Sequence, residues 1–116
     1  MTTDTPRVAA GNLGALEGRA ALDAAISEKA FAQLVIDTAR VMGWMVYRTF
    51  DSRRSPSGYP DLCMVRGSRF IIAELKTERG ALRPDQREWL RALDEAVPEV
   101  HLWQPRDWDR ILEVLR

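Results

Sequence analysis

The sequence is poor in the residues that would make a disulfide-rich or membrane-embedded protein. Its 116 residues include one cysteine, Cys63, and one histidine, His101. A single cysteine excludes an intrachain disulfide and favours a cytosolic setting, and a lone histidine is expected to be structural. No apolar run approaches the roughly 20 residues that span a bilayer, and residues 1–7 lack the pattern of a secretory signal. We therefore expect one domain that is stabilised by its own core.

An excess of charge of either sign is also missing, because 17 basic residues balance 17 acidic ones. The distribution is uneven. Residues 48–91 carry ten basic and six acidic side chains, whereas acidic residues outnumber basic ones on both flanks. Nearly all basic residues are arginines, whose planar donor fork suits phosphate. A basic middle segment is compatible with nucleic-acid binding, but a solvated mixed surface accounts for these charges equally well.

Hydrophobic periodicity predicts an α/β domain. An amphipathic helix is expected from the N-cap Ser27 to about Met42, with Gly43 ending it. The later elements are expected as strands 44–50, 60–65 and 69–76, a helix 84–96, a strand 99–103 and a helix that starts at residue 105. This order predicts a mixed sheet with helices on both faces. The apolar run in residues 69–76 predicts a central strand that is covered on both sides.

The first 26 residues are less well determined. They are rich in alanine, glycine and threonine, and Gly11, Gly14 and Gly18 interrupt any regular pattern. Residues 20–26 have the composition of a short helix. We expect residues 1–26 to be a flexible or weakly ordered arm, or a loosely attached helix, before a folded domain over residues 27–116.

Three charged residues stand at the ends of predicted strands: Asp61 begins one strand, and Glu74 and Lys76 end the next, where burial alone would favour Val or Ile. Because side chains alternate along a strand, Glu74 and Lys76 should emerge on the same face. Asp61 lies six residues before Gly67 and Glu74 lies seven after it, so a hairpin should make the two carboxylates neighbours. Adjacent carboxylates repel unless a cation or a proton sits between them.

This arrangement fits a magnesium site for phosphodiester hydrolysis. Mg²⁺ favours one or two carboxylates, completed by water and phosphate oxygens, and it activates bound water. Lys76 would position or activate the attacking water, or neutralise charge in the transition state. The competing interpretation is a simple ion pair between Glu74 and Lys76, which is common at a strand end; the Pro60-Asp61 pair at its spacing favours the metal site.

Three motifs occur in order: Gly58-Tyr-Pro-Asp-Leu62, Ala73-Glu-Leu-Lys-Thr-Glu-Arg-Gly80 and Leu82-Arg-Pro-Asp-Gln-Arg-Glu-Trp-Leu90. Together they resemble the VRR-NUC family of the PD-(D/E)xK nuclease superfamily. The resemblance extends from about Ser27 to Leu115. It implies a restriction-endonuclease-like fold, with an αβββαβ core whose mixed four-stranded sheet is flanked by helices.

The resemblance also implies roles for single residues. Asp61 and Glu74 would bind Mg²⁺ or Mn²⁺, the backbone carbonyl of Leu75 would add a ligand, and Lys76 would be the catalytic lysine.

Two further residues match the family's pattern. Gln86 would contact the site or the substrate, and Glu28 would bind the metal directly or through water. Each also has an ordinary interpretation as a polar residue in the first turn of a helix. Arg83 departs from the family, which often has a small polar cap there; this weakens the helix start and touches no catalytic role.

The implied function is a metal-dependent endonuclease that hydrolyses DNA, with branched or Holliday-junction-like DNA as substrate. Cutting two strands requires two active sites, which favours a homodimer, and the setting would be the cytoplasm of a bacterium or a phage-infected cell. Arginines in and around the loop before the site would contact the phosphate backbone, or be solvated: Arg48, Arg53, Arg54 and Arg79. The alternatives are a catalytically inactive nucleic-acid-binding module of the same fold, and a restriction-type endonuclease.

Overall fold

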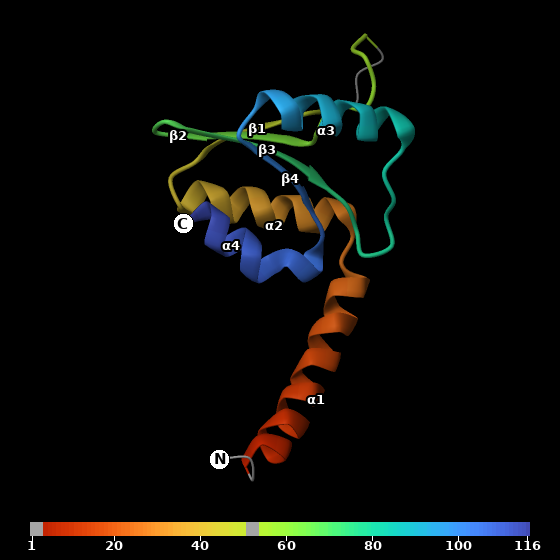
Figure 1. Cartoon of the computed structure of the whole chain (residues 1–116), viewed down its shortest axis with the longest axis vertical. Helices are drawn as coiled ribbons and strands as arrows, with labels where there is room; N and C mark the ends of the chain where they lie inside the picture. Colours follow the sequence, from red (N-terminus) through yellow and green to blue (C-terminus); the bar gives the residue numbers. More distant parts are fainter. Residues whose placement is uncertain (1–3, 51–53) are drawn as a thin grey trace.

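The computed structural model of the chain describes residues 4–50 and 54–116, with side chains from residue 14 onward. In chain order the elements are α1 Asp4–Ala25, α2 Glu28–Val41, β1 Met45–Arg48, β2 Leu62–Arg66, β3 Arg69–Leu75, α3 Pro84–Ala96, β4 Glu99–Trp103, the 3₁₀ turn η1 Pro105–Asp107 and α4 Trp108–Leu115 (Figure 1).

The four strands form one sheet in the order β1-β2-β3-β4. The pairs β1–β2 and β2–β3 are antiparallel, whereas β3 and β4 are parallel and joined through α3. From α2 to β4 this is the predicted αβββαβ core with a mixed sheet, so the predicted fold class is confirmed. β3 is central, and its last five residues are buried, as its apolar run predicts.

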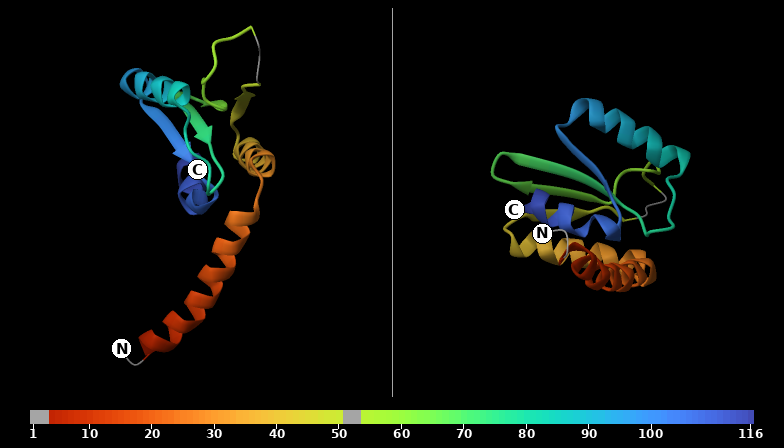
Figure 2. Two further views of the ribbon diagram at one scale, coloured as in Figure 1. Left: turned by 90° about the vertical axis from the view of Figure 1, so that its right-hand side faces the viewer. Right: turned by 60° about the horizontal axis from the view of Figure 1, so that its bottom comes forward.

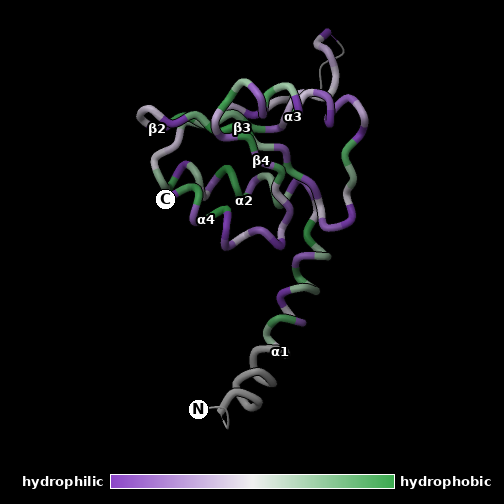
Figure 3. The backbone as a smooth tube through the Cα atoms, in the orientation of Figure 1, coloured by the Kyte–Doolittle hydropathy of each residue, from purple (hydrophilic) through white to green (hydrophobic). Residues whose placement is uncertain are grey.

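Helices cover both faces of the sheet, α2 and α4 on one and α3 on the other (Figures 1 and 2). Ile71, Ala73 and Leu75 of β3 belong to the core cluster beneath α2 and α4, together with buried side chains of both helices. Figure 3 shows hydrophobic stretches where these helices meet the sheet. Burying each large apolar side chain contributes about 1.5–3 kcal/mol, which makes this layer the main source of stability. The alternate residues of β3, including Glu74, point toward the α3 side.

Local signals in the sequence explain where most elements begin and end. The Ser27 hydroxyl accepts a hydrogen bond from the Ala30 amide (3.1 Å), which confirms the N-cap of α2. Gly43 has a φ of +90°, a left-handed conformation suited to glycine, and it follows the end of α2 as predicted. α3 and β4 have the expected bounds. β1 is shorter than the predicted strand 44–50, and the last helix begins with a 3₁₀ turn.

α1 is a continuous helix that extends away from the sheet (Figures 1 and 2). It begins well before residues 20–26, and neither Gly14 nor Gly18 ends it. Its C-terminal end adjoins the core: Arg19 lies 3.8 Å from Asp109 of α4, and Leu22 lines an apolar hollow with Trp108. Among the residues with a described structure, no helix combines the length and apolar character needed to cross a membrane.

Candidate active site

Asp61 and Glu74 lie side by side at the end of the β2–β3 hairpin. Leu62 pairs with Ala73, so Asp61 and Glu74 occupy the next position along the ladder. The Asp61 amide donates to Glu74 Oε1 (3.2 Å), and the Leu75 amide donates to Asp61 Oδ2 (2.8 Å). Each carboxylate is thus held by a backbone amide near the other. The hairpin geometry predicted from the spacing is confirmed.

Glu74 is a buried carboxyl group, with only 1% of the residue exposed. Its Oε2 atom has no hydrogen-bond partner in the described part of the chain. The pKa of Glu74 is raised to about 8, first by burial and then by a hydrogen bond to the Asp61 carboxyl and by the Asp61 charge, while Lys76 and the Asp61 amide act in the opposite direction. A proton shared with Asp61 therefore relieves the repulsion between the two carboxylates, and a cation bound between them would have the same effect.

Lys76 follows β3 on the same side of the sheet as Glu74, as the alternation predicts. Its amide donates to the carbonyl of Trp103 (2.9 Å), which continues the pairing with β4 and fixes the backbone. The side chain is only 12% exposed, and Nζ lies 3.9 Å from Glu74 Oε2. This is an ion pair without a hydrogen bond, so the ammonium group remains able to donate to a ligand.

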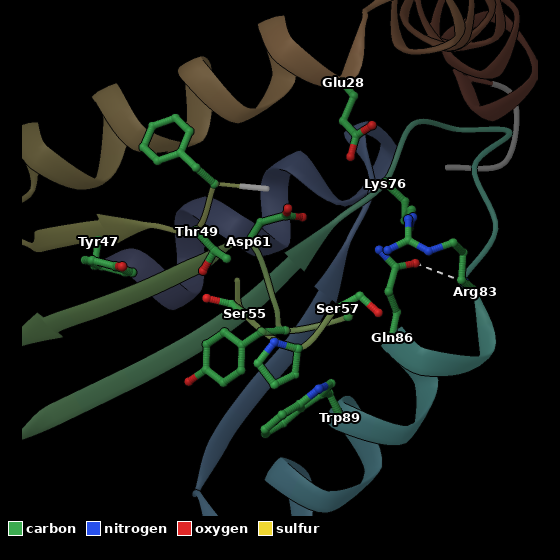
Figure 4. A pocket seen from close by; sticks show the side chains of 14 residues that line it. Glu28, Tyr47, Thr49, Ser55, Ser57, Asp61, Lys76, Arg83, Gln86 and Trp89 are labelled. Carbon is green, nitrogen blue, oxygen red and sulfur yellow. Dashed lines mark hydrogen bonds between the residues drawn. The ribbon is translucent and has the colours of Figure 1, made fainter. Parts of the chain in front are cut away.

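Asp61 and Lys76 open into a cleft of about 690 Å³ (Figure 4). Its walls come from the start of α2, the end of β1, the loop before β2 and the first turns of α3. The lining residues are Glu28, Tyr47, Thr49, Phe50, Ser55, Pro56, Ser57, Gly58, Tyr59, Asp61, Lys76, Arg83, Gln86 and Trp89. A cleft of this size falls within the range of ligand sites.

The loop before β2 is docked onto α3, and this docking positions Asp61. A hydrogen bond from Ser57 lowers the pKa of Asp85 in the first turn of α3. Gly58, with a φ of +96°, lies so close to this turn that a Cβ would come within 2.7 Å of the Asp85 backbone. The rings of Tyr59 and Trp89 meet edge to face at 5.1 Å.

Gln86 lies in the first turn of α3 and is buried, with 7% exposed. Its Oε1 accepts a hydrogen bond from the Arg83 amide (2.9 Å), which stabilises the helix start. The side chain of Arg83 has no acceptor atom and cannot accept a hydrogen bond from the Gln86 amide. Asp85 Oδ1 accepts that hydrogen bond instead (2.9 Å). Gln86 therefore has the helix-turn role of the ordinary interpretation and lines the cleft as well.

Glu28 lies across the cleft from the carboxylate pair, at the start of α2, and its carboxylate points into the cleft (Figure 4). Over residues 14–50 and 54–116, no three acidic, histidine or cysteine side chains come close enough together to hold one metal ion. The structure thus brings Asp61 and Glu74 together and places Glu28 on the opposite wall of the cleft. Leu75 is fully buried in the core, so only its backbone is available to the site.

The arginines predicted to meet nucleic acid occupy different positions. Arg48 ends β1, lies 5.6 Å from the ring of Phe50, and lines a second hollow with Glu28 and Asp61. Arg54 and Arg79 are exposed, the first in the loop before β2 and the second in the turn after β3. Arg53 lies outside the described residues, so its predicted contact with the phosphate backbone stays a prediction.

Several residues that line the cleft carry no signal of a functional role in the sequence. Thr49 donates its amide to the Asp61 carbonyl (2.8 Å), and its buried hydroxyl has no hydrogen-bond partner in the described structure. In the sequence it is one more β-branched residue of a strand. Tyr47 also lines the cleft, although its alternation with Val46 and Arg48 signals only an exposed strand position.

The αβββαβ core with a mixed four-stranded sheet flanked by helices is the restriction-endonuclease-like fold, and Asp61, Glu74 and Lys76 lie together at the end of its central hairpin. A family model described as the VRR-NUC domain matches residues 19–104, and the chain therefore belongs to the VRR-NUC family. The match begins within α1, earlier than the expected start at Ser27, and ends before α4. Searches of curated proteins and of solved structures each returned no match.

Proposed function

We propose that this chain is a metal-dependent endonuclease that hydrolyses DNA phosphodiester bonds. The observation that carries the proposal is the buried Glu74 carboxyl group beside Asp61, whose Oε2 atom has no hydrogen-bond donor in the described structure. Leaving such an oxygen without a donor is costly. A divalent cation would satisfy it and remove the repulsion from Asp61.

The donor set fits Mg²⁺ or Mn²⁺ better than a softer metal. Asp61 and Glu74 supply carboxylate oxygens and the Leu75 carbonyl supplies a third oxygen, which suits hard cations that keep several waters. Such an ion, when bound, polarises the phosphoryl group and lowers the pKa of a bound water. Glu28, on the opposite wall, would add a carboxylate, either directly or through water.

The remaining roles belong to side chains that donate hydrogen bonds. The ammonium group of Lys76 orients the attacking water and neutralises charge that develops on the phosphate. Gln86 commits its oxygen to the Arg83 amide, which leaves its amino group to donate to a phosphate oxygen. We expect Arg48, Arg53, Arg54 and Arg79 to hold the flanking phosphates.

The substrate that we propose is branched DNA, such as a Holliday-junction-like structure, in the cytoplasm. Each chain carries one catalytic pair and one lysine, so cutting two strands needs two chains, and we propose a homodimer. An inactive binding module of the same fold is the competing function. The presence of Asp61, Glu74 and Lys76 in one constellation favours catalysis over that alternative.

The test is cleavage of one labelled strand presented as linear duplex, flap and four-way junction, with Mg²⁺, with Mn²⁺ or with EDTA. We expect cleavage with either metal, and none with EDTA. Asp61→Asn and Lys76→Ala should each lower the rate at least about 100-fold. Asp94→Asn, an exposed change on α3 outside the cleft, is the matched control and should leave the rate unchanged.

Cleavage that survives both Asp61→Asn and Lys76→Ala would overturn the site assignment. Binding to DNA without cleavage in either metal would identify the inactive module instead. Light scattering at the concentrations of the cleavage assay measures the oligomeric state, and a monomer that cuts both strands of a junction would contradict the proposed homodimer.

A further inference from the structure

α3 covers only part of its face of the sheet. It packs on the β4 side, and the β2–β3 hairpin extends beyond it (Figure 2). In the uncovered part, Met45, Val65 and Phe70 are directly opposite one another on β1, β2 and β3 and so share a face. Tyr47 shares it by alternation. We call these four residues the open sheet face. The exposed fractions are 77% for Met45, 68% for Tyr47, 43% for Val65 and 39% for Phe70.

Tyr47 connects the open sheet face to the catalytic cleft. It lines the cleft with Asp61 and Lys76, and in Figure 4 Thr49 stands between Tyr47 and Asp61. Thr49 pairs with Asp61 through its amide (2.8 Å). Two residues along a strand span about 7 Å, a length comparable with one nucleotide of an extended single strand. A strand whose phosphate lies at Asp61 therefore has its neighbouring base within reach of Tyr47.

The Tyr47 ring is available to a ligand. Within residues 14–50 and 54–116, no hydrogen bond, ring contact or cation–π contact engages it, whereas Tyr59 is held against Trp89 and Phe50 lies beneath Arg48. Aromatic rings that stack on nucleobases contribute about 1–3 kcal/mol per base. Inside a duplex the faces of the bases are covered by their neighbours, so a base away from the duplex end must be unpaired to stack on this ring.

We propose that the open sheet face binds an unpaired strand of nucleic acid, and that the base next to the scissile phosphate stacks on Tyr47. The position of the scissile phosphate rests on the proposed function. Met45, Val65 and Phe70 offer apolar contact to bases and no donor to phosphates, so they suit a strand that lies with its bases on the sheet. The enzyme would then select substrates that are unpaired beside the cut.

A second copy of the chain is a weaker fit to this surface. A stable protein–protein interface engages roughly 20–30 residues on each side, far more than the four exposed side chains of the open sheet face. A short unpaired strand needs only a few stacking positions and a continuous path to the catalytic cleft, and Tyr47 provides that continuity.

The test measures binding without metal, so its outcome does not depend on cleavage. Fluorescence anisotropy with the full chain would compare a labelled 12-nucleotide single strand with a blunt duplex of the same sequence. Tyr47→Ala should weaken binding to the single strand about tenfold and leave duplex binding unchanged. Tyr47→Phe, which keeps the ring, should stay within about twofold of wild type. Phe70→Ala should have a smaller effect in the same direction.

Val41→Ala is the matched control, because Val41 is 87% exposed at the end of α2, on the other side of the sheet. It should change neither affinity. Equal losses for single strand and duplex in Tyr47→Ala, no loss at all, or a Tyr47→Phe loss as large as that of Tyr47→Ala would each overturn the inference. A wild-type dimer that becomes a monomer in Tyr47→Ala would also overturn it, in favour of a second copy.

The two proposals can fail separately. A chain that cleaves nothing in Mg²⁺ or Mn²⁺ but loses single-strand binding in Tyr47→Ala supports the open sheet face and contradicts the proposed hydrolysis. The opposite result is a chain that cleaves junctions through Asp61 and Lys76 but whose Tyr47→Ala variant binds both nucleic acids as wild type does. It supports the proposed hydrolysis and contradicts the open sheet face.

Discussion

Glu74 places a carboxyl group where the packing of the chain offers it little stabilisation. It is buried beside a second carboxylate, its Oε2 lacks a hydrogen-bond donor in the described structure, and the ammonium group of Lys76 is 3.9 Å from that oxygen. A buried polar group with incomplete partners costs stability, and such strained placements are typical of functional sites.

We therefore expect Glu74→Gln to stabilise the metal-free protein and to abolish cleavage. In EDTA at pH 8, its free energy of unfolding should rise by about 1 kcal/mol, because a neutral amide of similar shape removes the repulsion from Asp61 and can donate to it. Thermal melts measure the effect. Added Mg²⁺ should raise the Tm of wild type and leave that of Glu74→Gln unchanged. A variant less stable than wild type in EDTA would show that the carboxylate is stabilised without metal.

The elements around the site depend on one close contact between a loop and a helix. The loop before β2 approaches the first turn of α3 at Gly58, with no room for a side chain. On either side of this contact, Ser57 forms a hydrogen bond with Asp85, and the ring of Tyr59 packs edge to face on Trp89. Because Pro60 and Asp61 follow directly, the position of the Asp61 carboxylate, which we propose as a metal ligand, depends on this docking.

Gly58→Ala tests this dependence. A Cβ within 2.7 Å of backbone atoms, at a φ of +96°, should lower the free energy of unfolding by roughly 2–4 kcal/mol. Cleavage should fall with it, because the loop must move away from α3. Gly67→Ala in the β2–β3 turn is the matched control: its φ is +60° but no atom lies within 4 Å of the added Cβ. It should cost about 1 kcal/mol, from the backbone conformation alone. Equal losses in urea unfolding would contradict the close contact.

At the scale of the whole molecule, an ion pair joins the two strands that flank the crossover. Arg69 at the start of β3 donates to both carboxylate oxygens of Glu99 at the start of β4, at 3.0 and 2.6 Å. The Arg69 guanidinium also lies 5.0 Å from the ring of Trp44, whose indole nitrogen donates to the Leu115 carbonyl at the end of α4. The pair thereby connects the sheet to the C-terminal helix.

The stability of the molecule should depend on pH through this pair. The hydrogen bonds from Arg69 lower the pKa of Glu99 below its ordinary value of 4.5. A lowered pKa means that the stabilisation is present above about pH 4.5 and is lost as the pH falls through the folded-state pKa. Glu99→Gln should therefore be about 1 kcal/mol less stable than wild type at pH 7, and the difference should disappear in acid.

Urea unfolding at several pH values measures this difference. Glu113→Gln on α4 is the control, because Glu113 is exposed and makes no ion pair within the described residues. It should follow wild type at every pH. A Glu99→Gln deficit that persists unchanged below pH 3 would show that the two strands are joined by packing and not by charge.

Local patterns in the sequence determined much of this protein. Alternation along residues 69–76, and the distances of Asp61 and Glu74 from the turn at Gly67, predicted the carboxylate pair, because a hairpin has only one register compatible with a short turn and a buried face. The N-cap at Ser27 and the proline at the start of α3 defined helix ends for equally local reasons. The ordered motifs predicted the family.

Tertiary structure decided the rest, because burial and exposure depend on which elements cover which. The sequence predicts that Glu74 neighbours Asp61, but only the tertiary structure buries the Glu74 side chain and leaves its Oε2 without a hydrogen-bond partner in the described residues. The resemblance predicted Glu28 as a metal ligand, but only the path of α2 decides that its carboxylate lies across the cleft from Asp61. In the sequence Tyr47 is an ordinary strand residue. Only the tertiary structure shows that α3 covers the β4 side of this sheet face and leaves Tyr47 exposed.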